Sequence, residues 1–257
     1  GRGELRHLLL KTTEKTQQCL VTFVTFCEPS PQLLSLAKDV FRSHPAIKGV
    51  VQNVNQKRGN AIIGDTYRVL EGEGSIEEEL CGLLFKVSSA SFFQVNPQQA
   101  ENVYREAIQR AELTGEESVV DAYCGVGTLA CLFAPHVKRV YGIECVPEAV
   151  EDAKANAQKN EIDNTEFICG LAEEKIEAID RVDLLLVNPP RAGCEPQFLQ
   201  EIGRLAPKRI IYISCDPATL ARDLAAWKEL GYSIGQLQPF DMFPQTAHVE
   251  SLVCLTK

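Results

Sequence analysis

The alternation of strand-like and helix-like segments over residues 97–257 constrains the fold more than any other feature of the chain. Short apolar, β-branched runs recur there, and longer stretches with helical periodicity separate them. Strands that alternate with helices form parallel sheets, because each helix returns the chain to the same edge of the sheet. We therefore expect an α/β fold with a mainly parallel sheet covered by helices. Ligands of such open sheets bind beyond the carboxyl ends of the strands.

Five strands and five helices are expected in this part of the chain. The strands are residues 118–123, 137–144, 164–169, 182–188 and 208–214, and the helices are residues 97–112, 127–135, 147–160, 195–205 and 217–230. Pro147 and Pro217 fall in the first turns of their helices, where the missing N–H costs nothing. The final apolar segment, residues 248–257, follows the run before it too closely for a helical crossover. We therefore expect a late strand that pairs antiparallel with its neighbour.

A different pattern precedes residue 97, where short alternating or β-branched runs surround one stretch with helical spacing of apolar side chains. The expected elements are strands at residues 19–26, 47–54 and 60–70 and a helix at residues 31–44. We expect two domains, a small α+β central subdomain over residues 1–96 and an α/β domain over residues 97–257.

Composition limits the class of protein. No apolar run approaches the roughly 18 residues that a membrane helix needs, and no signal peptide opens the chain. Ten cysteines occur without a CxxC pair, so we expect reduced thiols in the cytoplasm rather than a disulfide framework or a metal site. The net charge of −9 does not exclude a nucleic-acid partner, because an acidic protein can still present a local basic groove.

A glycine-rich turn, DAYCGVGTLA over residues 121–130, joins an expected strand to an expected helix. Gly125 and Gly127 allow close backbone approach to a ligand, and the helix N-terminus adds the positive end of its dipole. The next strand ends in Glu144, an acid that can bind a ribose diol. The pattern fits a dinucleotide or S-adenosylmethionine, with Asp121 and Gly125 beside the methionine end, or else a structural turn with an incidental acid. The turn alone does not decide between them.

Two motifs follow later strands. NPPRAG, residues 188–193, is a rigid proline turn that can aim Asn188 and backbone carbonyls at a planar base, or can simply end the strand. Next to the following helix, Cys215 precedes Asp216, an expected N-cap, and Pro217. A helix N-terminus lowers the pKa of a nearby thiol, whereas the Asp216 carboxylate acts in the opposite direction. A free cysteine is otherwise most often a small buried hydrophobe.

The last strand offers a candidate base. His248 and Glu250 are two residues apart, so we expect them on one face of that strand, with Glu250 in the same cleft as the cysteine. A solvent-facing alternation on an edge strand would give the same pattern. Before the α/β domain, Phe92, Phe93 and Gln94 form a group that is usually a core contact but can support a ligand.

Taken in order, these segments resemble the RNA uracil-5 methyltransferases, which methylate uridine in tRNA T-loops and bacterial large-subunit rRNA. The resemblance covers about residues 90–257, and GELRHLLL, residues 3–10, looks like the opening of the family's central domain. The matching motifs are FFQVN, DAYCGVGTLA, YGIE, NPPRAG, SCDPATLARD and DMFPQTAHVE.

The resemblance implies a Rossmann-like class I methyltransferase with S-adenosyl-L-methionine as cofactor and tRNA or 23S rRNA as substrate. It implies that Cys215 is the nucleophile and Glu250 the base that removes a proton. Its implied cofactor contacts are Gln94, Tyr123, Glu144 and Asn188. The cysteine would add to C6 of a uracil that has been turned out of the RNA, so that C5 becomes nucleophilic. Lys57 and Arg58 are candidate phosphate contacts, and a monomer is favoured.

Three departures from the family pattern are visible. The family usually has aspartate at Asn188 and asparagine at Asp216, which changes the charge at both positions. Many members also begin with an RNA-binding barrel, and some carry an iron–sulfur cysteine cluster. Neither is recognisable here, so the chain is expected to be a truncated piece or a minimal member.

Other functions stay open. The NPP turn also resembles the signature of adenine-N6 amino-group methyltransferases, although Arg191 stands where they have an aromatic residue. An RNA cytosine-5 enzyme would have a second cysteine at that place, whereas Cys194 comes three residues later. An NAD oxidoreductase would leave Cys215 and Glu250 without a role. An RNA-binding protein without catalytic activity is the last alternative.

Overall fold

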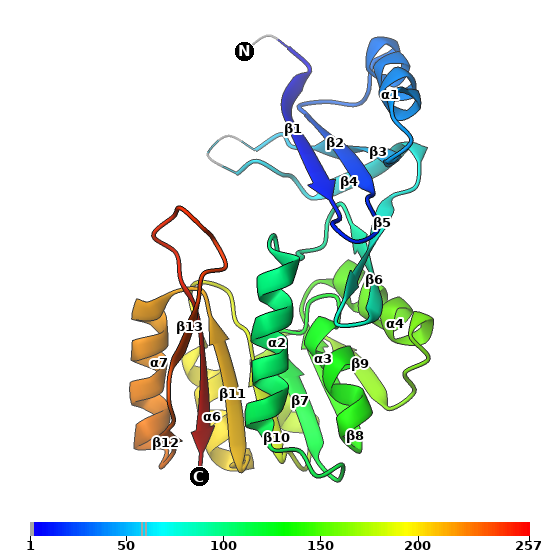
Figure 1. The fold of residues 1–257 in the computed structure, drawn as a ribbon. Coiled ribbons are helices and arrows are strands. Elements are labelled where there is room, and N and C mark those ends of the chain that lie inside the picture. Colours follow the sequence, from blue (N-terminus) through cyan, green and yellow to red (C-terminus); the bar gives the residue numbers. More distant parts are fainter. Residues whose placement is uncertain (1–2, 58, 60) are drawn as a thin grey trace. The chain divides into compact units, whose positions relative to one another are not determined.

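The computed structural model describes residues 3–57, 59 and 61–257, so the candidate phosphate contact Arg58 lies outside the described residues. The chain divides into two compact units, Gly1–Ser91 and Phe92–Lys257 (Figure 1). The division thus lies five residues earlier than the sequence predicts, and residues 92–96 belong to the second unit. None of the described helices has the length and apolar character needed to cross a membrane.

The first unit contains a four-stranded sheet in the order β1-β2-β3-β4 and a separate hairpin of β5 and β6. The strands are β1 (Leu5–Thr12), β2 (Cys19–Thr25), β3 (Ile47–Val54), β4 (Thr66–Gly72), β5 (Ser75–Leu80) and β6 (Leu83–Ser88). Helix α1 (Pro31–Ser43) connects the parallel strands β2 and β3 and packs Leu33 and Ala37 onto the sheet. The expected helix and the first two expected strands are confirmed.

The strand expected at residues 60–70 is wrong in its first half, because β4 begins only at Thr66. Side-chain amides bind the backbone just before it. Asn53 donates to the Gly64 carbonyl at 2.9 Å, and Asn55 donates to the carbonyls of Ala61 and Ile62. These bonds satisfy the loop backbone locally and replace a sheet ladder.

The second unit is built on an eight-stranded sheet in the order β12-β14-β11-β10-β7-β8-β9, with β13 also paired to β14. Its strands are β7 (Ser118–Ala122), β8 (Arg139–Glu144), β9 (Thr165–Cys169), β10 (Leu184–Val187), β11 (Arg209–Ser214), β12 (Ser233–Ile234), β13 (Gln238–Phe240) and β14 (Glu250–Thr256). Strands β7 to β11 are parallel, and β14 is antiparallel to β11. The mainly parallel sheet and its late antiparallel strand are confirmed.

The helices of the second unit precede, connect and follow its parallel strands. They are α2 (Pro97–Ala111), α3 (Thr128–Phe133), α4 (Pro147–Lys159), α5 (Ala172–Lys175), α6 (Pro196–Leu205) and α7 (Pro217–Glu229), with 3₁₀ turns η1 (Ala134–His136) and η2 (Ile176–Ala178). In Figure 1, α2 and α3 lie in front of the sheet and α6 lies behind it. Fully buried Phe198 and Trp227, from α6 and α7, join sheet residues such as Leu185 in one core. The strands that end at the candidate site are anchored in this core.

Candidate functional site

The glycine turn follows β7 as the sequence predicts, and three of its residues have a positive φ. The φ angles are 101° at Tyr123, 54° at Gly125 and 78° at Gly127. A Cβ on Gly127 would lie 3.0 Å from Ala153 Cβ and from the Phe167 ring, so a side chain is excluded by both backbone and space. At the start of α3, the backbone of the turn therefore packs directly against Ala153 and Phe167, with no side chain between them.

Glu144 closes the turn from the end of the next strand. Its Oε2 accepts a hydrogen bond from the Gly125 N–H at 3.0 Å, and its Oε1 accepts one from the Val146 N–H at 2.9 Å. Both oxygens are thereby fixed, while a carboxylate retains further lone pairs for other donors. Glu144 is half-buried, so those lone pairs can reach a ligand. This arrangement suits the binding of two neighbouring hydroxyls.

Two buried polar atoms of this turn, Asp121 Oδ1 and the Tyr123 hydroxyl, have no hydrogen-bond partner within the described part of the chain. The same holds for Gln94 Oε1, which comes before α2 in the chain. Asp121 is 1% exposed and accepts one bond from the Ala130 N–H, and burial raises its pKa to about 7. Burial also raises the pKa of Tyr123, whose ring packs against Phe198. Buried polar groups are nearly always satisfied, so such orphans indicate a missing partner.

Cys215 directly follows β11, and Asp216 caps α7 as the sequence predicts. The Asp216 carboxylate accepts hydrogen bonds from the N–H groups of Ala218 and Thr219 at 3.0 and 2.9 Å. The two opposing influences expected from the sequence, the helix N-terminus and Asp216, are not the largest ones acting on the Cys215 pKa. Burial and then the Glu250 carboxylate raise the thiol pKa, and these effects exceed the opposing hydrogen bond and charge of Arg191.

Glu250 is the first residue of β14 and only 2% exposed. Burial raises its pKa to about 7. The antiparallel register pairs Ser214 with Ser251, so Cys215, one residue after Ser214, and Glu250, one residue before Ser251, lie side by side. The structure thus brings together the two side chains that the sequence predicts to be reactive.

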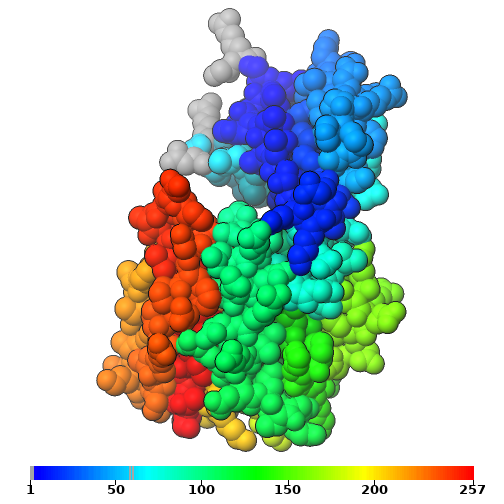
Figure 2. Space-filling view, in the orientation of Figure 1, coloured from blue at the N-terminus to red at the C-terminus, as the bar shows by residue number. Residues whose placement is uncertain are grey.

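His248 does not lie on the last strand with Glu250, so that expectation is wrong. The strand begins only at Glu250, and residues 244–249 are all exposed. Figure 2 shows the segment between β13 and β14, in orange to red, at the surface of the second unit. The His248 ring contacts Phe243 edge-on, at 6.1 Å between centroids.

The proline turn begins at half-buried Asn188, directly after β10, and folds back through a bond from the Gly193 N–H to the Pro190 carbonyl at 2.8 Å. Side chains of α7 hold it. Thr219 Oγ1 donates to the Arg191 carbonyl at 3.0 Å, and Arg222 donates to the Ala192 carbonyl at 2.8 Å. These contacts were not foreseen from the sequence. The segment SCDPATLARD contains their donors, but its spacing does not reveal their partners.

The carboxyl ends of parallel strands meet at one edge of a sheet, and an antiparallel strand begins at that edge. Tyr123, Glu144, Asn188, Cys215 and Glu250 follow or begin strands at this edge of the second unit. Gln94, which precedes α2, does not follow a strand of this sheet and is not part of this set. In the described ranges, no group of three or more His, Cys, Asp or Glu side chains is arranged to hold a metal ion.

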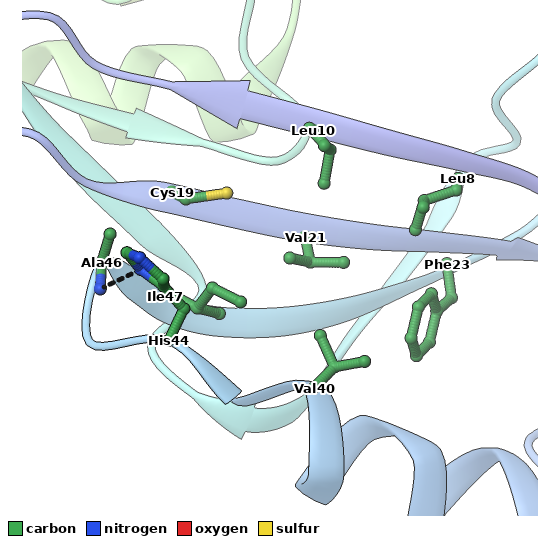
Figure 3. A pocket seen from close by; sticks show the side chains of 9 residues that line it. All are labelled: Leu8, Leu10, Cys19, Val21, Phe23, Val40, His44, Ala46 and Ile47. Atoms are coloured by element: carbon green, nitrogen blue, oxygen red, sulfur yellow. Dashed lines mark hydrogen bonds between the residues drawn. The ribbon is translucent and has the colours of Figure 1, made fainter. Parts of the chain in front are cut away.

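The first unit contains a separate apolar cavity of about 390 Å³, lined by side chains of β1, β2, β3, α1 and the turn after α1 (Figure 3). Its only ring nitrogens belong to His44, whose Nδ1 accepts a hydrogen bond from the Ala46 N–H at 3.2 Å. The candidate phosphate contact Lys57 is also in this unit, where it forms an exposed ion pair with Asp65 at 2.7 Å. Neither feature belongs to the sheet-edge site.

The sheet topology, the glycine turn and the acid at the end of β8 define a class I methyltransferase fold. The sequence model described as tRNA (Uracil-5-)-methyltransferase matches residues 51–257. The chain belongs to this family, and the resemblance seen in its motifs is confirmed.

Similar proteins agree with this assignment. An uncharacterized RNA methyltransferase of Clostridium acetobutylicum is 45% identical over 261 residues, which cover 100% of this chain and 57% of that protein. One from Oceanobacillus iheyensis is 42% identical, covering 99% of this chain and 56% of that protein. The chain thus spans a little over half the length of these relatives.

Among solved structures, the Pyrococcus abyssi tRNA (uracil-54, C5)-methyltransferase in complex with S-adenosyl-L-homocysteine superimposes with a TM-score of 0.81. It is 30% identical, and the match covers 99% of this chain and 60% of that one. The M. jannaschii tRNA m1G37 methyltransferase matches with a TM-score of 0.60 at 14% identity, over 98% of this chain and 76% of that one. The second likeness shows the shared fold alone.

Proposed function

We propose that this chain transfers a methyl group from S-adenosyl-L-methionine to C5 of a uridine in tRNA or 23S rRNA through a covalent bond between Cys215 and C6. The observation that carries the proposal is the pairing of Cys215 with Glu250 at the sheet edge that also holds the glycine turn. Family membership and the names of the relatives support the reaction class. All ten cysteines are free thiols, which supports action in the reducing cytoplasm.

The residues at the glycine turn fit the cofactor. Glu144 is oriented to accept hydrogen bonds from the ribose hydroxyls, and the unpartnered polar atoms of Gln94 and Tyr123 would gain partners from the bound molecule. Asn188, at the proline turn, would supply a neutral amide contact. When bound, S-adenosylmethionine supplies a methyl group on a positively charged sulfur.

Cys215 and Glu250 would divide the chemistry on the uracil between them. The Cys215 thiolate adds to C6 and leaves an enolate with electron density at C5, the atom that becomes methylated. A base must then take the C5 proton, so that the enolate forms again and expels the thiolate from C6. Glu250, with a pKa of about 7, is partly ionised at neutral pH and is suited to accept that proton.

We propose that the first unit contributes contacts to the RNA. Lys57 is a candidate because its ion pair with Asp65 is exposed, at 58% and 81% of the two side chains, and exposed pairs are weak. Phosphate contacts of this kind position an RNA without specifying its sequence. The target uridine would have to turn out of its stack to reach Cys215.

Labelled methyl transfer to unmodified tRNA and to 23S rRNA fragments, followed by mass spectrometry of the nucleosides, tests the proposal. We expect 5-methyluridine. Methyladenosine would favour the amino-group alternative, but Arg191 argues against it, because those enzymes have an aromatic residue at that position. Binding of NAD instead of S-adenosylmethionine would contradict both.

A further inference from the structure

The Asp223 carboxylate links helix α7, strand β11 and the end of the proline turn. Asp223, in α7, is 1% exposed, and its Oδ2 accepts hydrogen bonds from the Tyr212 hydroxyl of β11 at 2.6 Å and from the Cys194 N–H at 2.9 Å. Its Oδ1 accepts two more from Arg222, at 2.9 and 2.7 Å. A buried carboxylate with four donors is satisfied and held rigidly.

The proline turn is fastened to α7 beside this carboxylate. Arg222 binds the Ala192 carbonyl, and Thr219 binds the Arg191 carbonyl. Gly193 has a φ of 80°, and a Cβ there would lie 2.3 Å from Thr219 Cγ2 and 2.6 Å from Asp223 Oδ2. The turn and the helix therefore meet in close contact, with no space for a side chain between them.

Both the start of α7 and the proline turn lie close to Cys215. Helix α7 begins two residues after Cys215, and its first turn holds the Arg191 backbone through Thr219. The Arg191 guanidinium is near enough to the Cys215 thiol to lower its pKa, against the larger effect of burial. The charged groups acting on that thiol are Arg191 from the turn and Glu250 from β14. Any loosening of the turn would change the distance between the guanidinium and the sulfur, while Glu250 would keep its place in the sheet.

We propose that Asp223 is a positioning residue whose buried carboxylate holds the proline turn so that Arg191 reaches the Cys215 sulfur and stabilises its thiolate. The proposal rests on the proposed role of Cys215 as the nucleophile. Asp223 itself touches no reacting atom and acts through Arg191. A purely structural carboxylate would affect folding but would leave the thiol unchanged.

The test is the pH dependence of Cys215 alkylation by iodoacetamide in the protein without RNA. Cleavage after Arg209 and Arg222 gives the peptide of residues 210–222, in which Cys215 is the only cysteine, so mass spectrometry follows this thiol alone. In Asp223→Asn and in Arg191→Gln we expect the midpoint to rise by about one pH unit, a tenfold loss of thiolate below it.

A double variant with both Asp223→Asn and Arg191→Gln shows whether the two residues act on the Cys215 thiol together or independently. If Asp223 acts through Arg191, the double variant shifts the midpoint no further than Arg191→Gln alone. Additive shifts, or an unchanged midpoint in Asp223→Asn, would overturn the proposal. If Asp223→Asn does not fold, Arg222→Gln replaces it, because that side chain is 59% exposed and also binds the turn. In that variant the peptide extends to Lys228, and Cys215 is still its only cysteine.

Asp183→Asn is the matched control. Asp183 accepts hydrogen bonds from the Ser118 N–H at 3.1 Å and from Arg181, at the opposite edge of the sheet. This variant should lower stability without moving the Cys215 midpoint. The alkylation result is independent of the reaction class. Continued methyl transfer by Cys215→Ala would reject the proposed function, whereas unshifted alkylation would reject only the role of Asp223.

Discussion

Glu250 lies beside Cys215 where the antiparallel strand β14 begins next to the end of β11, and after burial its carboxylate is the largest influence that raises the pKa of the thiol. Burial raises the pKa of the Glu250 carboxylate as well, to about 7. The pairing suits a site where one group attacks and the other removes a proton.

Replacement of Cys215 tests the nucleophile. Cys215→Ala should reduce methyl transfer by at least about 10³-fold, because the alanine side chain cannot add to C6. Binding of S-adenosylmethionine, measured by calorimetry, should change little. Cys27→Ala, at an exposed thiol of the first unit, is the control and should retain full activity. Substantial turnover by Cys215→Ala would exclude covalent catalysis by this residue.

Replacement of Glu250 tests the base. Glu250→Gln should lower kcat by about 10²–10⁴-fold, the usual contribution of general base catalysis, with a smaller effect on KM for RNA. Because the C5 proton then stays in place, the protein–RNA adduct should accumulate and be visible on a denaturing gel. His248→Gln changes an exposed neighbour and should leave both readouts unaltered. Fast turnover without adduct in Glu250→Gln would assign the proton transfer elsewhere.

The raised pKa of Glu250 also predicts how stability depends on pH. Burial raises this pKa from 4.5 to about 7, so between these values the folded protein binds a proton that the unfolded chain has released. The free energy of unfolding should therefore fall as the pH rises through this window, by roughly 3 kcal/mol from Glu250. Asp121, with its pKa raised to about 7, adds a loss of the same sign.

Urea unfolding at pH 5 and pH 8 measures this loss in the wild type and in Glu250→Gln. The glutamine side chain does not titrate, so the variant should lose less stability than the wild type over the same interval. Equal losses in the two proteins would show that Glu250 does not titrate as its burial implies.

The Tyr123 hydroxyl separates cofactor binding from folding. It is buried without a hydrogen-bond partner among the described residues, so Tyr123→Phe should leave stability unchanged or raise it by about 1 kcal/mol. If the hydroxyl contacts the cofactor, the same change should weaken S-adenosylmethionine binding by about tenfold. A variant with lower stability and unchanged affinity would refute this role.

Much of the second unit could be predicted, because local signals determine it. Proline at the first helical position and the Asp216 cap mark helix starts, and apolar runs mark β7 to β11. The hairpin of β5 and β6 was missed because Glu78, only 1% exposed, takes an inward-facing position in β5 and breaks the apolar alternation. The start of β4 was misplaced because the side chains of Asn53 and Asn55 bind the backbone of the loop before β4, which lies several residues further along the chain.

The site was predictable in its residue types but not in its electrostatics. The sequence shows a helix N-terminus and Asp216 as opposing influences on the Cys215 pKa, whereas burial and a carboxylate 35 residues away in sequence raise it. The contacts of Asp223 with Tyr212 and Cys194 likewise join segments that only the folded sheet brings together. Such long-range effects leave no periodic signal in a sequence.

Reaction of the protein with tRNA containing 5-fluorouridine, in the presence of S-adenosylmethionine, tests the central claim most directly. Fluorine at C5 cannot leave as a proton does, so the bond between the sulfur and C6 should persist. After digestion, we expect the peptide of residues 210–222 to carry the methylated fluorouridine nucleotide on Cys215. A nucleotide attached to any other residue, or methylated RNA with no attached protein, would contradict the account.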